Sequence, residues 1–152
     1  MDSHTKTCKV QIMKATLLIR ALSLTCAVWI FSNSAQADEK TDAAVVAAKE
    51  WLAVVDSKQY KKSWHEAAPF FKEHVKEKQW EEQISTVRGP LGKAESRELI
   101  EAQFTKILPG APEGEYVVIR FKTNFSGKPN SVETITPMMA DGSWRVSGYF
   151  IK

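Results

Sequence analysis

The sequence predicts an α+β domain in which three to four N-terminal helices pack on one face of a four-stranded antiparallel sheet. Up to about residue 90, apolar residues recur at intervals of three and four, which is the spacing of a buried helix face. After residue 93 they alternate with polar residues, as in strands with one buried face. Helices followed by strands are typical of a layered α+β domain, because the helices must cover the apolar face of the sheet.

The segment before this domain has the features of a signal peptide. Lys14 and Arg20 supply positive charge, residues 21–31 form a short apolar run, and Ala35-Gln36-Ala37 matches the small-x-small pattern that signal peptidase cleaves. The apolar run is about half as long as a membrane span requires, so we expect no stable span in the mature chain. We expect cleavage between Ala37 and Asp38.

Cleavage there would divide the chain into a signal peptide, residues 1–37, and a single periplasmic or secreted domain, residues 38–152. Met13 begins a cleaner signal peptide than Met1 does. A start at Met13, with residues 1–12 as a start-site artefact, therefore stands beside a start at Met1, and the sequence leaves the choice open.

Removal of the leader changes the composition of what remains. Both cysteines lie in the leader, so the mature domain has no disulfide, no thiolate metal site and no cysteine nucleophile. Without the leader's four basic residues and one acidic residue, 17 basic and 17 acidic residues remain, and the formal charge falls from +3 to zero. No basic face predicts nucleic-acid binding, and no ligand spacing predicts a metal or another cofactor.

Four helical segments are expected between residues 38 and 90. The second and third are short and aromatic, with Tyr60 and Trp64 in one and Pro69 at the start of the other. The fourth carries Trp80, and we expect it to end with Arg88 in its last turn, because Gly89 just past it and the proline after that favour a helix stop. The first carries one apolar stripe of Ala44, Val45, Ala48, Trp51, Leu52 and Val55.

Four strands are expected after residue 93. They cover residues 96–106, 115–125, 132–140 and 143–151. In the first strand Ile100, Ala102 and Phe104 are expected to face the core. Asp141-Gly142 is a strong signal for a two-residue hairpin between the last two strands.

The tight hairpin predicts a register for the last two strands. It pairs Met139 with Trp144, Pro137 with Val146, Ile135 with Gly148 and Glu133 with Phe150. One face is then apolar and carries Glu133, while the other is polar and carries Thr134, Thr136, Ser147 and Tyr149. Pro137 cannot donate a ladder hydrogen bond, so its strand is expected at an edge or bulged there. By analogy, a curved sheet of this kind wrapped on a helix gives the cone of cystatin-like and nuclear-transport-factor-like folds.

A set of residues spread over the whole mature chain resembles one known family. In the first half the set is Trp51-Leu52, Asp56, Tyr60, Ser63-Trp64, Ala67, Phe71, Val75, Trp80, Arg88, Pro90-Leu91-Gly92 and Ser96-Arg97. In the second half it is Leu108-Pro109-Gly110, Tyr116, Glu133-Thr134 and Asp141-Gly142-x-Trp144-Arg145-Val146-x-Gly148-Tyr149. The combination resembles the bacterial domain-of-unknown-function 4019 family. The resemblance implies a small exported bacterial protein and supplies no catalytic residues.

Two charged features stand out as candidates for function. Glu133 is placed among inward-facing apolar residues, where a carboxyl can serve as a general acid or base; alternatively it reaches solvent or pairs with an arginine. Arg88 and Arg97 flank the Pro-Leu-Gly turn and could converge on an anion. Alternatively Arg88 caps its own helix and Arg97 pairs with a nearby glutamate.

We therefore expect a non-catalytic exported module that binds a small ligand or a protein partner. The candidate ligand-binding residues are Trp51, Tyr60, Trp64, Trp80, Arg97 and Glu133. The alternative is a small cofactor-free isomerase or hydrolase that uses Glu133 in an aromatic pocket. A third reading is a homodimer that pairs through the polar face of the sheet.

Overall fold

The computed structural model describes residues 32–152 and divides the chain into two units, Met1–Ala37 and Asp38–Lys152. The charged and apolar parts of the predicted signal peptide, Met13 and both cysteines lie outside the described residues. The second unit is an α+β domain with its helices before its strands, which confirms the predicted fold class. In the described part of the chain, no helix is long and apolar enough to cross a membrane.

Within residues 32–152, four helices precede the sheet. The stripe predicted for the first of them is buried in the core, with Ala44, Ala48 and Leu52 fully enclosed. Pro69 takes the first position of its helix, as predicted, because a proline there gives up no intrahelical hydrogen bond. The helices are α2 (Ser32–Asp56), α3 (Tyr60–Glu66), α4 (Pro69–His74) and α5 (Glu77–Leu91).

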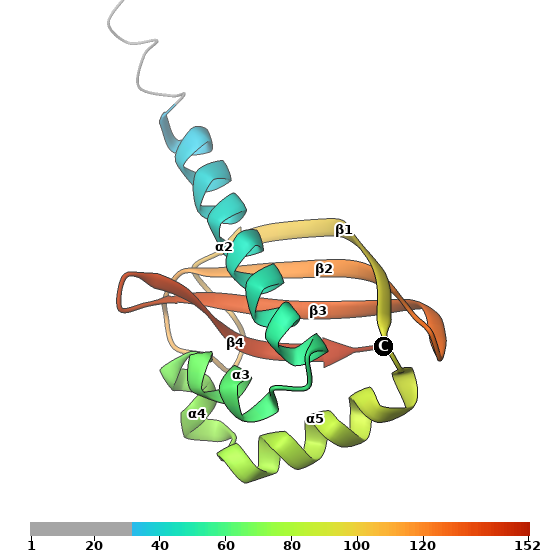
Figure 1. Ribbon diagram of the computed structural model, residues 1–152. Helices are drawn as coiled ribbons and strands as arrows, with labels where there is room; N and C mark the ends of the chain where they lie inside the picture. Colours follow the sequence, from blue (N-terminus) through green and yellow to red (C-terminus); the bar gives the residue numbers. More distant parts are fainter. Residues whose placement is uncertain (1–31) are drawn as a thin grey trace, which may run out of the picture. The chain divides into compact units, whose positions relative to one another are not determined.

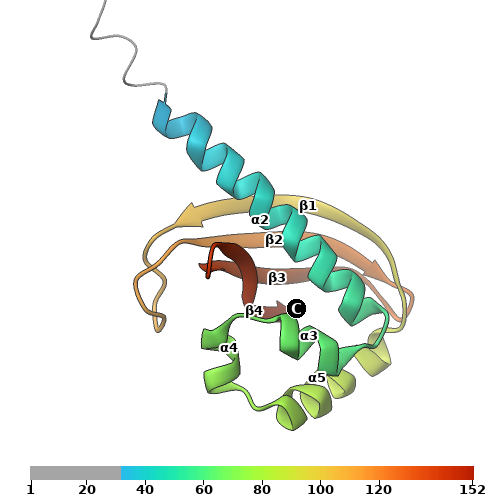
Figure 2. The ribbon, with the colours of Figure 1, turned by 60° about the vertical axis from the view of Figure 1, so that its left-hand side comes forward.

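The strands form one antiparallel sheet in the order β1-β2-β3-β4, so β1 and β4 are its edges. They are β1 (Ala94–Thr105), β2 (Tyr116–Phe125), β3 (Lys128–Ala140) and β4 (Ser143–Ile151). The sheet curves around α2, which crosses its inner face, while α3, α4 and α5 lie beside β4 (Figures 1 and 2). The core therefore forms between α2 and the inner face of the sheet, where Val117, Ile119 and Phe121 of β2 are fully buried.

The end of α5 differs from the prediction. The helix does not stop before Gly89 but continues through Pro90 to Leu91, and Gly92 then takes a positive φ of 73°. A proline in the last turn of a helix removes only its own backbone N–H donor, and its fixed φ is compatible with helical geometry. The helix can therefore continue past Pro90 to Leu91. The exposed carbonyl of Leu91 is satisfied from outside, because the backbone N–H of Gly127 donates to it at 2.9 Å. Gly127 lies at the turn between β2 and β3, so this hairpin caps α5.

Strand β1 also departs from the predicted alternation. Its pairing with β2 shifts between Leu99 and Glu101, which makes Ile100 the extra residue of a bulge. Ile100 is therefore 50% exposed, and the prediction that it faces the core is wrong. Beyond the bulge, Ala102 and Phe104 pack against the core as predicted.

For the last hairpin, the predicted turn is confirmed, but only half of the predicted register is. Asp141 and Gly142 both have positive φ, 51° and 75°, as a two-residue turn of this kind requires. Met139 pairs with Trp144 and Pro137 with Val146, as predicted. The register then shifts by one.

Ser147 is the extra residue at this shift, because Thr136 pairs with Gly148 while Pro137 pairs with Val146. Ile135 consequently pairs with Tyr149 rather than with Gly148, and Glu133 pairs with Ile151 rather than with Phe150. Because a shift of one residue exchanges the two faces of a strand, Tyr149 turns inward, and Phe150 turns outward, where it is 56% exposed.

Two predictions about this hairpin can therefore be judged. For Pro137 the sequence offered an edge strand or a bulge. Strand β3 lies inside the sheet, so the edge is wrong, and the register shift beside Pro137 confirms the bulge. Tyr149 does not belong to the polar outer face, so a dimer through that face would not include it.

Candidate functional site

A cluster of six hydrogen-bonded side chains lies between the helices and the sheet, and we call it the ionic cluster. Each of the four strands, together with α2 and α5, contributes one residue to it. The cluster holds two arginines and two carboxylates, so its formal charges balance. Its members are Asp56, Arg88, Arg97, Thr123, Glu133 and Tyr149.

Glu133 is the centre of this cluster and has no exposed surface. Its Oε1 accepts hydrogen bonds from the Tyr149 hydroxyl at 2.5 Å and from Arg88 Nη1 at 3.3 Å. Its Oε2 accepts from Arg97 Nε at 2.6 Å and from the Thr123 hydroxyl at 2.5 Å. Four donors on one buried carboxylate explain how β3 can carry an acid inside the core, since a buried charge without partners would be strongly unfavourable.

Arg97 connects Glu133 to the end of α2. Its Nη1 and Nη2 donate to the two carboxylate oxygens of Asp56 at 3.0 and 3.3 Å, while its Nε holds Glu133. Asp56 is the last residue of α2, where the helix dipole disfavours a negative charge, so the arginine relieves a local repulsion. Burial alone would lower the pKa of Arg97, but its hydrogen bonds to Asp56 and Glu133 outweigh burial and raise that pKa, which keeps the guanidinium charged.

Arg88 makes a parallel connection from α5. Its Nη2 donates to Asp56 at 2.6 Å, and its Nη1 is shared between Glu133 and the Tyr149 hydroxyl, 3.1 Å away. The guanidinium also stacks on Phe125, 4.6 Å from the ring centroid, which adds a cation–π contact. Arg88 and Arg97 thus converge on two carboxylates of the same chain. This is the alternative in which Glu133 pairs with an arginine and Arg97 with a glutamate, although that glutamate is Glu133 and not one close to Arg97 in the sequence.

Tyr149 links the cluster to a layer of aromatic rings. Burial, with the negative charge of Glu133 beside it, raises the pKa of the Tyr149 phenol, so the hydroxyl remains a donor. Its ring meets Trp51 edge-on at 5.5 Å and lies 6.4 Å from Trp80. The indole N–H groups of both tryptophans bond to Ser63, one to its carbonyl at 2.8 Å and the other to its hydroxyl at 2.9 Å. These tryptophans are therefore held rigidly in the core.

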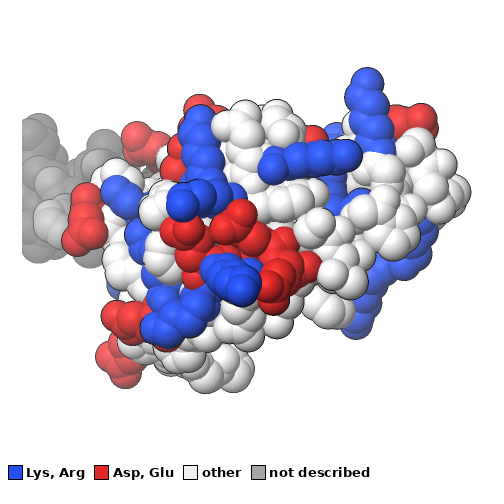
Figure 3. All heavy atoms as spheres, turned by 60° about the horizontal axis from the view of Figure 1, so that its bottom comes forward, with Lys and Arg blue, Asp and Glu red and all other residues white. Residues whose placement is uncertain are grey.

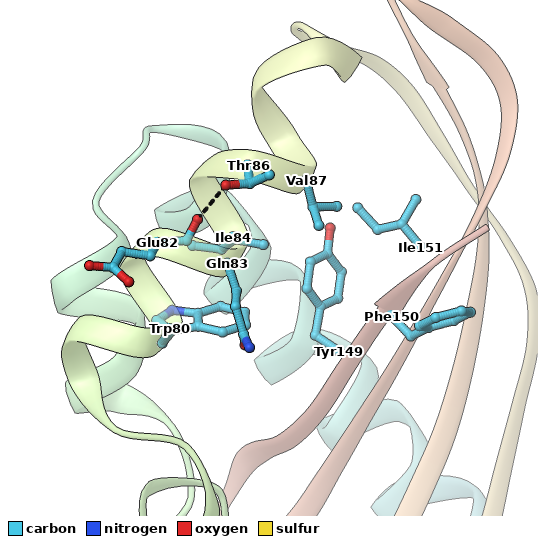
Figure 4. Close-up of a pocket in the computed structure, with 9 residues that line it drawn as sticks. All are labelled: Trp80, Glu82, Gln83, Ile84, Thr86, Val87, Tyr149, Phe150 and Ile151. Carbon is cyan, nitrogen blue, oxygen red and sulfur yellow. Dashed lines mark hydrogen bonds between the residues drawn. The ribbon is translucent and has the colours of Figure 1, made fainter.

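An open apolar groove of about 480 Å³ runs between α5 and β4. Figure 4 shows Tyr149 pointing from β4 toward α5, with its hydroxyl end near Val87, whereas Phe150 points to the other side of the strand. Trp80 and Ile84 close the groove from the helix. The full lining is Trp80, Glu82, Gln83, Ile84, Thr86, Val87, Tyr149, Phe150 and Ile151.

The residues singled out from the sequence fall into three places. Arg97 and Glu133 come together in the ionic cluster, Trp51 and Trp80 in the aromatic layer beside it, and Trp80 also lines the groove. Tyr60 lies apart, in a shallow hollow along α3. Trp64 is half-buried and donates its indole N–H to the carbonyl of Val75 at 2.8 Å.

Three residues of the ionic cluster, Asp56, Thr123 and Tyr149, were not among the candidates from the sequence, and Tyr149 is the one for which the sequence held a signal. Its inward position depends on the bulge at Ser147, and the proline that signalled a bulge was present in the sequence. Asp56 gave no comparable signal, because nothing in a single sequence shows which distant arginines a helix-terminal acid will meet.

Charge on the helical face of the molecule is mixed. In the view of Figure 3, acidic and basic side chains lie interspersed, and neither sign dominates that face. His65 belongs to this pattern, because its Nε2 lies 3.0 Å from Glu77, which also pairs with Lys61. Among the described residues, no group of three or more histidine, cysteine or acidic side chains is placed to hold a metal ion.

The fold and the site define a small α+β domain built around a buried ionic cluster, with an apolar groove at one edge of its sheet. The chain belongs to the family described as Protein of unknown function (DUF4019), whose model matches residues 47–149. This match confirms the resemblance seen in the sequence, and all six residues of the ionic cluster lie inside the matched range. A search of curated proteins finds no match.

Proposed function

We propose that this protein is a non-catalytic, exported binding module whose ligand site is the groove between α5 and β4. The observation that carries the proposal is the groove itself, which is about 480 Å³ of open space with walls formed mostly by apolar side chains. Volumes of this order are typical of pockets that hold small organic ligands or short segments of a partner. Val87 and Phe150, 48% and 56% exposed, leave apolar surface uncovered at its rim.

The ionic cluster supports this proposal as a scaffold. Arg88 of α5 and Tyr149 of β4 both donate hydrogen bonds to Glu133, so the cluster connects α5 to β4. Residues of α5 and β4 form the walls of the groove. A site whose walls are cross-linked in this way keeps its width without a ligand, which lowers the cost of ordering on binding.

The alternative of a cofactor-free isomerase or hydrolase that uses Glu133 is the weaker proposal. A general base must reach the proton that it removes. Glu133 has no exposed surface, and its two oxygens already accept four hydrogen bonds. Tyr149 lines the groove and donates to Glu133, so the phenol is the link through which such chemistry would have to pass.

Export is proposed from the leader. The predicted cleavage between Ala37 and Asp38 coincides with the boundary between the two units of the chain. N-terminal sequencing of the protein recovered from its native cells tests this, and a mature protein that still carries residues before Asp38 would contradict it.

A fluorescent dye with apolar aromatic rings tests the groove. We expect 1-anilinonaphthalene-8-sulfonate to bind the folded domain and to bind Val87→Asp about tenfold more weakly, because the new carboxylate puts a charge on the apolar wall. Val46→Asp is the matched control, since Val46 is also a helix valine, 55% exposed, and lies outside the groove. Equal dye binding by the two variants would count against the groove as the site.

A further inference from the structure

We propose that the occupant of the groove is an extended, uncharged peptide segment that pairs with the edge of β4 as an additional strand. This inference rests on the proposed function, because it names the class of partner for the same groove. It follows from the backbone of β4 rather than from the side chains that line the groove.

The backbone pairing of β4 shows which of its groups lack a partner strand. Val132 and Lys152 exchange both of their backbone hydrogen bonds, each near 3.0 Å. In an antiparallel ladder, hydrogen-bonded pairs alternate with pairs that are not hydrogen-bonded. The backbone N–H and C=O groups of Phe150 therefore also point toward β3, whereas those of Tyr149 and Ile151 point away from it. Because β4 is an edge strand, no further strand of the sheet lies on that side to pair with these groups.

Another part of this edge is already occupied. The carbonyl of Val146 accepts a hydrogen bond from the backbone N–H of Ala68 at 2.9 Å, so the start of α4 covers the edge there. No described residue makes a backbone hydrogen bond of this kind to the outward groups of Tyr149 or Ile151. Two consecutive positions of the ladder are therefore open, and they are the positions that line the groove.

A purely apolar ligand would cover these backbone groups without bonding them, which is unfavourable for each buried donor or acceptor. An extended peptide satisfies them, and it places alternate side chains against the apolar walls, as in other cases of strand addition. An edge left open in this way is a ready template for another strand.

The charge of the groove selects an uncharged segment. Among the nine described residues that line it, only Glu82 carries a charge, and Figure 4 shows its carboxylate directed away from Tyr149. A lysine or glutamate of the peptide would find no partner between Val87 and Ile151, whereas valine, isoleucine or threonine at alternate positions would fit.

Selection from a phage-displayed library of random heptapeptides, followed by synthesis of an enriched peptide, tests the inference. We expect enriched sequences with apolar residues at alternate positions, and chemical-shift changes at the Tyr149 and Ile151 amides when the synthetic peptide binds. N-methylation of alternate amides in that peptide should weaken binding about three- to tenfold for each hydrogen bond lost.

The protein side of the interaction is tested with Ile151→Pro. This change removes an N–H that points away from β3, so it leaves the existing ladder intact, and edge positions tolerate proline. Ile151→Val is the matched control and should bind like the wild type. If the proline variant does not fold, the N-methylated peptide gives the same test on the unmodified protein.

The outcomes separate the inference from the proposed function. Equal binding of the N-methylated peptide, or no enriched peptide while the dye still binds at Val87, would overturn the peptide inference alone. Failure of both peptide and dye to bind would overturn the proposed function as well. Pairing of β4 with a second copy of the chain, seen as a dimer that the peptide does not dissociate, would also overturn the inference.

Discussion

Tyr149 and Glu133 meet on the inner face of the sheet because one extra residue in β4 changes the register between them. Ser147 is that residue, and its hydroxyl donates to the carbonyl of Thr136 at 2.7 Å, which holds the bulge in place. In a regular ladder continued from the turn at residues 141–142, Tyr149 would lie on the outer face. The bulge therefore places a groove residue in direct contact with the ionic cluster.

Loss of the charge on Glu133 should destabilise the fold severely. Glu133→Gln preserves the shape of the side chain but leaves Arg88 and Arg97 facing a neutral group in a buried site. Removing one partner from a buried ion pair costs about 3–5 kcal/mol, a large part of the stability of a small domain. Urea unfolding measures this change.

Glu101→Gln is the matched control for that experiment. Glu101 pairs with Arg120 at 3.4 Å, and both side chains are about half exposed, at 50% and 46%. An exposed pair of this kind contributes about 0–1 kcal/mol. If the two glutamine variants lose similar free energies of unfolding, Glu133 does not have the central role that its contacts indicate.

The planar guanidinium of Arg97 should contribute to stability through its geometry as well as through its charge. Its three donor atoms hold Asp56 and Glu133 at once, and a lysine amine cannot reproduce that planar geometry. Arg97→Lys should therefore lower the free energy of unfolding by about 1–3 kcal/mol. Arg120→Lys, at an exposed pair, should stay within about 0.5 kcal/mol of the wild type, and a similar effect of both changes would contradict the bridging role.

Alkaline pH should destabilise the wild type through Tyr149. Burial raises the pKa of this phenol in the folded state, so above about pH 10 the unfolded chain releases a proton that the folded chain keeps. The stability is complete below that pH and is lost as the pH rises, by up to about 1.4 kcal/mol per pH unit.

Tyr149→Phe isolates this effect. Burial also raises the pKa of Tyr116, but that residue is present in both proteins and cancels in the comparison. The free energy of unfolding should therefore fall less steeply above pH 10 in the variant, as followed by urea titrations at several pH values. Equal slopes for the two proteins would mean that Tyr149 does not keep its proton in the fold.

Local chemistry made most of the fold predictable. The stripe around Leu52, the proline at residue 69 and the turn at Asp141-Gly142 each follow from spacing or from backbone preference, and all three are present. The bulge at Ile100 was missed, and the one at Ser147 was expected only as an alternative at Pro137 and did not enter the predicted register, because an extra residue changes the face of a strand without changing its composition. Pro137 was the single warning of such a shift.

The candidate site was predictable only in part, for a related reason. Glu133 and Arg97 were recognised individually, since an acid on an apolar face and an arginine beside a turn both call for a partner. Asp56, the second partner of Arg97, lies on another element, and the ion pairs that Arg97 makes with the two acids exist only once the sheet has closed on α2. Contacts of this range are set by the tertiary fold.

The approach of the β2–β3 turn to the end of α5 gives a last prediction. A Cβ added at Gly127 would lie 2.5 Å from the carbonyl oxygen of Pro90 and 3.1 Å from that of Leu91, and backbone atoms cannot move aside easily. Gly127→Ala should therefore lower the free energy of unfolding by about 1–3 kcal/mol and loosen the end of α5 that the turn caps. Gly89→Ala, in the same helix with no atom within 4 Å of the new Cβ, should instead stabilise the protein by about 0.5–1 kcal/mol. Urea unfolding of both variants checks the pair, and a Gly127→Ala protein as stable as the wild type would show that the turn does not pack on the helix.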